Sequence, residues 1–151
     1  MKSPFKTEEK RPFVVIVGKR AGYVQIATSR ETTQHAEVPL ALFDACQAWT
    51  AFLQTQENVS KVYWLQFSEV VEHLHWHLYP RFTHDTLKGT EAFNARHTPE
   101  AEIPWDLHWQ AALFQWANRY DVAILDPEAV LAEPAVLFPD YSFPDYSEVT
   151  S

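Results

Sequence analysis

Short runs of β-branched and apolar residues predict four strands in this chain. Residues 12–17 and 23–28 form two such runs, and the glycine-containing stretch between them predicts an antiparallel hairpin. Residues 62–67 predict a third strand. Polar and apolar side chains alternate strictly over residues 73–79, so we expect a fourth strand there, which ends at Pro80.

Apolar residues at helical spacing predict two helices. The first is expected over residues 39–56, because proline suits a first helical turn and an apolar stripe follows it. This stripe consists of Phe43, Cys46, Trp49 and Leu53. The second helix is expected over residues 106–119. Its inward-facing residues are expected to be Leu107, Leu113, Phe114 and Ala117. Residues 82–104 are polar, and we expect them to be irregular.

Together these elements predict an α+β fold, in which a mainly antiparallel sheet of about five strands carries the long helix on one face. The chain has 151 residues, of which 46% are apolar and 21% are charged, and this suits one globular domain. We assign residues 1–137 to that domain. Residues 138–151 are expected to form an extended arm, because Phe-Pro-Asp-Tyr-Ser occurs there twice and proline disfavours a helix. We expect the arm to pack on its own domain or on a dimer partner; the alternative is a solvated tail.

Composition and charge exclude several classes of function. The chain has only three glycines, which cannot build a glycine-rich phosphate loop of the Walker or Rossmann kind. Its net charge is −8 and no dense Lys/Arg cluster occurs, so no nucleic-acid partner is expected. The single cysteine, Cys46, is expected to be a buried structural thiol, which suits a reducing cytoplasm. We expect no signal peptide, no membrane-spanning segment and a cytoplasmic location.

Three histidines at alternate positions indicate a functional site. On a strand, His73, His75 and His77 would share one face, while Trp76 and its apolar neighbours would be buried on the other. Three imidazoles in a row are rarely needed for packing alone. Two chemistries suit such a row: it binds a metal ion, or one imidazole attacks phosphorus while its neighbours bind phosphate. A nucleophilic imidazole must keep the proton on its other nitrogen, often held by a backbone carbonyl. The spacing alone does not separate these alternatives.

The segment His73-Leu-His-Trp-His-Leu-Tyr79 resembles the signature of the histidine-triad (HIT) family, in which three histidines alternate with apolar residues. The following Pro80-Arg81 also matches many members. Residues 61–71 resemble the strand and phosphate loop that precede the triad in bacterial members, and the preceding hairpin and helix have the right order. The resemblance covers residues 12–82, a little under half of the chain, and its implied fold is HIT-like.

This resemblance implies a two-step mechanism that needs no metal and no other cofactor. His75 would attack the α-phosphorus of a nucleotide and expel the leaving group, so that a covalent nucleotidyl-histidine forms. Water would then release the nucleotide. His73 and His77 would contact phosphate oxygens and help the leaving group depart. Members of the family are typically homodimers, so a homodimer is implied as well.

The substrate-binding residues implied by the resemblance are Ser68, Glu69, Val70 and Tyr63. Backbone amides of the loop that begins at Ser68 would hold the nonbridging oxygens, and Tyr63 stands near the ribose-binding position. The chain departs from the family here, since Val70 removes a hydroxyl that would reach phosphate and Glu69 replaces a neutral amide. Glu72 adds a second carboxylate beside the triad. Such carboxylates disfavour an anionic substrate unless they are paired or turned away, and they would raise the pKa of a neighbouring histidine.

The auxiliary histidine that often follows the second strand in the family has no clear counterpart. Glu31 falls closest to its position, and His35 comes four residues too late. The remaining histidines are expected to be surface residues. They are His84, His97 and His108.

The resemblance therefore implies a nucleotide hydrolase or nucleotidyl transferase that acts on a nucleoside phosphoramidate or a dinucleoside polyphosphate. Two alternatives stay open. In one, the altered phosphate loop no longer supports turnover and the protein is a nucleotide-binding module. In the other, the histidines bind a metal ion.

Overall fold

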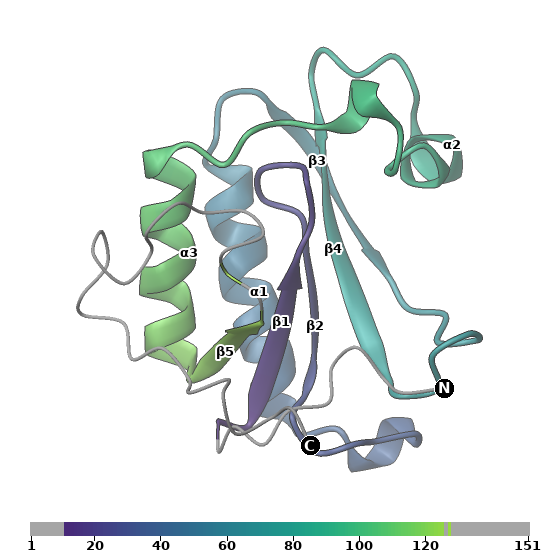
Figure 1. Cartoon of the computed structure of the whole chain (residues 1–151), viewed down its shortest axis with the longest axis vertical. Helices are drawn as coiled ribbons and strands as arrows, with labels where there is room; N and C mark the ends of the chain where they lie inside the picture. The colour runs from purple at the N-terminus through teal and green to yellow at the C-terminus, as the bar shows by residue number, and fades with distance from the viewer. Residues whose placement is uncertain (1–10, 126, 128–151) are drawn as a thin grey trace.

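A five-stranded mixed sheet forms the centre of the molecule (Figure 1). The computed structural model describes residues 11–125 and 127, so the expected arm at residues 138–151 lies outside the described residues. The strand order is β3-β4-β2-β1-β5. Their bounds are β1 Phe13–Val17, β2 Val24–Thr28, β3 Val59–Leu65, β4 His75–Phe82 and β5 Val122–Leu125. Three neighbouring pairs are antiparallel and the β1–β5 pair is parallel, which confirms the α+β class.

The two long helices lie together on one face of the sheet (Figure 1). They are α1, Leu40–Gln54, and α3, Leu107–Tyr120. The expected apolar stripe of α1 faces the sheet, and its buried members Cys46, Trp49 and Leu53 share one core with α3. Burial raises the pKa of the Cys46 thiol to about 12, which keeps it protonated and unreactive. The expected structural role of this cysteine is confirmed.

Strand β4 divides its side chains between the two faces of the sheet as the alternation predicts. Trp76 and Leu78 belong to the core beneath α1 and α3, and the Trp76 ring meets the Phe43 ring edge-on at 5.2 Å between centroids. His75 and His77 project from the opposite face. The burial of Trp76 is therefore confirmed.

The bounds of β4 differ from the expectation at both ends. The strand begins at His75 rather than His73, and it continues through Pro80 to Phe82. Pairing with β2 ends at Leu78, so Pro80 pairs only with β3. A proline is tolerated there because, at this position, β4 has no partner strand on the side of β2, so no ladder hydrogen bond on that side is lost.

Residues 82–104, expected to be irregular, contain a short helix and a single 3-10 turn. The helix is α2, Gly89–Asn94, and the turn is η2, Pro99–Ala101. A second 3-10 turn, η1, spans His35–Glu37. Helix α2 lies apart from α1 and α3, beside the upper ends of β3 and β4 (Figure 1). Its Phe93 packs on the side of the sheet that the two long helices leave uncovered.

The chain beyond α3 also differs from the expectation. Asp106 caps α3 by accepting a hydrogen bond from the Trp109 amide at 3.1 Å, and Asp121 ends it in a left-handed conformation. This turn leads directly into β5, which the sequence pattern did not reveal.

The expectation that Leu107 faces inward is wrong, because it occupies the first position of the helix and is 62% exposed.

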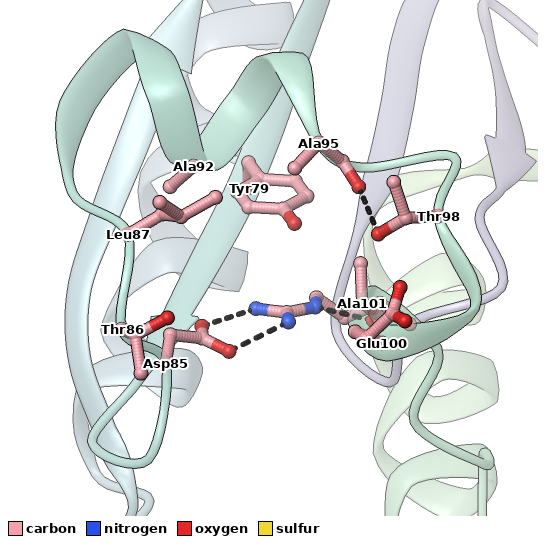
Figure 2. Close-up of a pocket in the computed structure, with 10 residues that line it drawn as sticks. Tyr79, Asp85, Thr86, Leu87, Ala92, Ala95, Thr98, Glu100 and Ala101 are labelled. Carbon is pink, nitrogen blue, oxygen red and sulfur yellow. Dashed lines mark hydrogen bonds and ion pairs between the residues drawn. The ribbon is translucent and has the colours of Figure 1, made fainter.

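A buried ion pair connects the β1–β2 turn to the segment that carries α2. The Arg20 guanidinium donates to both carboxylate oxygens of Asp85, at 2.6 and 2.9 Å, and to the carbonyl of Ala101 at 2.7 Å (Figure 2). It also donates to the carbonyl of Pro80 at 3.0 Å. The pair lines a small pocket of about 80 Å³. Because the loop after β4 and the η2 turn both bond to one side chain, the position of α2 relative to the sheet depends on this pair.

The ion pair predicts a loss of stability in acid. Burial alone would raise the pKa of Asp85, but hydrogen bonds from Arg20 and the Phe82 amide outweigh it and lower the pKa. Such a group stabilises the fold above its unfolded-state pKa of about 3.9, and this contribution is lost as the pH falls through the folded-state pKa. We expect Asp85→Asn to lower the free energy of unfolding by about 2 kcal/mol at neutral pH.

Urea unfolding over a range of pH measures this effect. The difference between wild type and Asp85→Asn should hold at neutral pH and shrink once the pH falls below the ordinary Asp value of about 4. A difference that stays constant into acid would show that the carboxylate charge does not contribute.

Candidate functional site

A cleft of about 380 Å³ lies on the face of the sheet opposite α1 and α3. Three segments surround it: β4 with its neighbour β2, the loop after β3, and the end of α2. The residues that line it are Gln25, Phe67, Ser68, Glu69, Val70, Val71, His75, His77, Phe93, Arg96 and His97. A volume of this size is within the range of small-molecule sites. Two of the three expected histidines therefore border one concave surface.

The tautomer of His75 is set by a backbone carbonyl. Its Nδ1 lies 3.0 Å from the carbonyl oxygen of His73. A carbonyl can only accept, so Nδ1 carries the proton and the neutral ring keeps its lone pair on Nε2. This is the form that an imidazole nucleophile requires. The rings of His75 and His77 are 5.1 Å apart between centroids, so both can contact one small group in the cleft.

His77 is held as a neutral imidazole. Burial, together with the nearby positive charges of His75, Arg96 and His97, lowers the pKa of His77 to about 3. Its Nδ1 lies 2.8 Å from the hydroxyl of Tyr23, whose own pKa is raised by burial. When the neutral phenol donates to Nδ1, His77 presents Nε2–H as a donor for a phosphate oxygen.

His73 does not reach the cleft, contrary to the expectation. Because it precedes β4, its ring turns towards the end of β2, where its Nε2 lies 3.3 Å from the Thr28 hydroxyl. Only 2% of the residue is exposed, and it does not line the cleft. Burial lowers the pKa of His73, while the charge of Glu31 partly opposes this shift. The contribution of His73 to the site is its carbonyl, which orients His75.

The loop after β3 borders the cleft as expected. Ser68 adopts a left-handed backbone conformation, and the His75 amide donates to its hydroxyl at 3.4 Å. Gln66 donates to the same hydroxyl at 2.6 Å and contacts His35 through its carbonyl oxygen at 3.0 Å. This chain of hydrogen bonds fixes the loop against β4. The exposed side chains of Glu69 and Val70 line the cleft.

Tyr63 does not border the cleft, contrary to the ribose-binding role implied for it. Its hydroxyl accepts a hydrogen bond from the Gly89 amide at 2.8 Å, and Tyr63 packs against the cluster formed by Tyr23, Tyr79 and Phe93. Gly89 is the first residue of α2 and has a positive φ. Tyr63 therefore anchors the short helix to the sheet.

Sequence reasoning missed Arg96, Phe93 and Gln25 as residues of the cleft. It placed His97 on the surface, and His97 is indeed exposed, but it also borders the cleft. No motif marks Arg96 and His97, and α2 is too short for a periodic pattern. The fold alone brings them to the triad. His84 and His108 are exposed, as expected.

For His73, the carboxylate whose charge raises the pKa is Glu31, and not Glu69 or Glu72. Its charge is the largest influence raising the pKa of His73 against the effect of burial. Glu72 is exposed and does not line the cleft, while Glu69 lies on its rim. Glu69 is the one carboxylate among the cleft-lining residues that the structure describes.

Metal-site geometry does not occur in the part of the chain that the structure describes: no three His, Cys, Asp or Glu side chains there converge on one point that could hold an ion. One reason is that the His73 ring turns away from the other two histidines. Among the same residues, no helix has both the length and the apolar character needed to cross a bilayer.

No protein-family model, curated protein or solved structure matches this chain. The functional argument therefore depends on the geometry of the cleft and on the chemistry of its residues.

Proposed function

We propose that this protein is a HIT-like nucleotide hydrolase or nucleotidyl transferase, in which His75 forms a covalent intermediate with the α-phosphate. The observation that carries the proposal is the hydrogen bond from His75 Nδ1 to the His73 carbonyl. It leaves the lone pair on Nε2 of a histidine that lines a cleft of about 380 Å³.

In the first step, the Nε2 lone pair of His75 forms a bond to the α-phosphorus. The bond between this phosphorus and the leaving group breaks, and its electron pair leaves with that group. A polyphosphate leaves as an oxyanion, whereas an amine takes up a proton from solvent as it leaves. The positive charge gained by the imidazole ring is stabilised by the His73 carbonyl, which still accepts the hydrogen bond from Nδ1–H. In the second step, water attacks the phosphorus, the N–P bond breaks, and the proton lost by the water passes to solvent.

Other groups at the cleft suit the anionic part of this reaction. The neutral His77 can donate Nε2–H to a nonbridging oxygen, which avoids the cost of creating a buried charge. The loop that begins at Ser68 is held against His75 by its hydroxyl, so its backbone is preorganised beside the same oxygens. Preorganised donors of this kind act on charge that develops in the transition state.

Substrate screening with mass spectrometry tests the proposal. The protein is incubated with adenosine and guanosine phosphoramidates and with dinucleoside polyphosphates, in the presence of EDTA. We expect release of the nucleoside monophosphate and, after rapid quenching, a protein mass increased by one nucleotidyl group on the peptide that contains His75. Activity that EDTA abolishes would favour metal chemistry, and the absence of turnover with every substrate would refute the hydrolase assignment.

A nucleotide-binding module without turnover is the second candidate. It is favoured by the rim of the cleft, where Glu69 places a carboxylate and Val70, which is 77% exposed, offers no hydroxyl to a phosphate. Nucleotide binding by isothermal titration, combined with no turnover in the screen, would identify this role.

A homodimer is a further part of the proposal. Light scattering of the protein in solution measures its mass and so tests this oligomeric state.

A further inference from the structure

The residues that follow α2 place a basic pair at the cleft, Arg96 and His97. The Arg96 guanidinium stacks on the Phe93 ring, with its carbon 4.0 Å from the ring centroid, and donates to the Phe93 carbonyl at 3.0 Å. The Phe93 ring in turn meets the His77 ring edge-on at 5.0 Å between centroids. Stacking and hydrogen bonding hold the half-buried guanidinium beside His77.

Among the described residues, Arg96 has no carboxylate counterion. In the described part of the chain, no Asp or Glu forms an ion pair with it, although the protein carries a net charge of −8. Arg20 shows the contrasting case, since Asp85 binds it through two oxygens. The charges that face the cleft are those of Arg96, the titratable His75, His77 and His97, and the rim carboxylate of Glu69.

A fixed guanidinium in this position lowers the pKa of His77 and so opposes any positive charge on the triad. That unfavourable interaction is offset when an anion enters the cleft. Guanidinium groups bind phosphate with two parallel hydrogen bonds, and such charge-assisted bonds are stronger than neutral ones. A protonated amine would be repelled by the same group.

We propose that Arg96, assisted by His97, binds a phosphate of the leaving group, so that the cleft selects substrates whose α-phosphate is followed by further phosphates. This inference rests on the proposed function and names its substrate class as dinucleoside polyphosphates rather than phosphoramidates. When the bond from the α-phosphorus to the bridging oxygen breaks, the electron pair leaves on a phosphate oxygen. The guanidinium neutralises that charge, so the departing group needs no proton. An amine leaving group requires a proton instead, and Arg96 supplies none at neutral pH.

A substrate comparison with Arg96→Gln tests the inference. Glutamine keeps hydrogen-bonding capacity and removes the charge, and Arg119→Gln, at the exposed end of α3, is the matched control. We expect Arg96→Gln to lower kcat/KM for a diadenosine polyphosphate by about 10- to 100-fold, as loss of a charge-assisted hydrogen bond does. For an adenosine phosphoramidate, kcat/KM should change by less than about threefold, and Arg119→Gln should affect neither substrate. An equal loss for both substrates, or no loss for the polyphosphate, would overturn the inference.

Equilibrium binding separates this inference from the proposed function. Isothermal titration with AMP and ADP needs no turnover, and it measures the effect of one added phosphate. The wild-type protein should bind ADP more tightly than AMP, and Arg96→Gln should abolish that difference. If this holds but no substrate is turned over, the phosphate subsite stands and the hydrolase assignment fails. If AMP and ADP bind equally to both proteins, the subsite does not exist.

Discussion

Replacing His75 with alanine is expected to lower kcat at least about a thousandfold, because removal of a covalent nucleophile usually costs several orders of magnitude in rate. The variant lacks the nitrogen that we propose forms the bond to phosphorus, while the other residues that line the cleft remain. Steady-state kinetics with a diadenosine polyphosphate measure the rate. The nucleotidyl adduct should also be absent from the mass spectrum of the variant.

A matched control for this variant is His108→Ala, because His108 is exposed on α3 and does not line the cleft. It should keep wild-type kinetics. Circular dichroism and thermal unfolding establish that His75→Ala is folded, and His75→Asn offers a second variant with a polar side chain in the same place. Turnover by either folded His75 variant at the wild-type rate would refute the covalent mechanism.

The largest effect on stability is expected for Trp49→Ala, which should lower the free energy of unfolding by about 3–5 kcal/mol. Trp49 is fully buried and its ring packs against Trp116 of α3 at 5.3 Å between centroids. Its indole N–H also donates to the Gly22 carbonyl at 2.8 Å, in the turn between β1 and β2. The substitution therefore creates a cavity and leaves a buried acceptor without its donor.

Urea unfolding of Trp49→Ala is best compared with Trp64→Ala. Trp64 lies on β3, is 43% exposed, and donates to the Thr50 hydroxyl of α1. Its loss removes a surface contact rather than a core residue, and we expect about 1 kcal/mol. Similar losses of stability in the two variants would show that the packing around Trp49 is not the main contribution to the core.

The elements that the sequence predicted correctly are those whose pattern is complete within a short segment. The hairpin of β1 and β2 and the amphipathic helix α1 belong to this group, because the direction of each side chain follows from the local backbone period. The missed elements are α2 and β5, with six and four residues respectively. Segments this short carry too few periodic positions to stand out from a loop.

Strand β5 illustrates why topology escapes sequence reasoning. It pairs in parallel with β1, from which it is separated by most of the described chain. Parallel pairing depends on a long crossover connection and on the burial of both strands. Neither condition can be recognised from the sequence of the four residues of β5. The expected mainly antiparallel sheet is thus a mixed one with a single parallel pair at its edge.

For the candidate site, the sequence by itself determined that His75 and His77 share one face of a strand while Trp76 is buried behind them, because alternation is a local property of the extended backbone. Only the tertiary structure decided which groups surround those two histidines. In the folded chain, the His73 ring lies beside Thr28, Tyr63 anchors α2, and Arg96 lines the cleft. Each of these placements depends on how the loops and the short helix outside the strand pack against the sheet. That packing is set by contacts between segments that are distant in sequence.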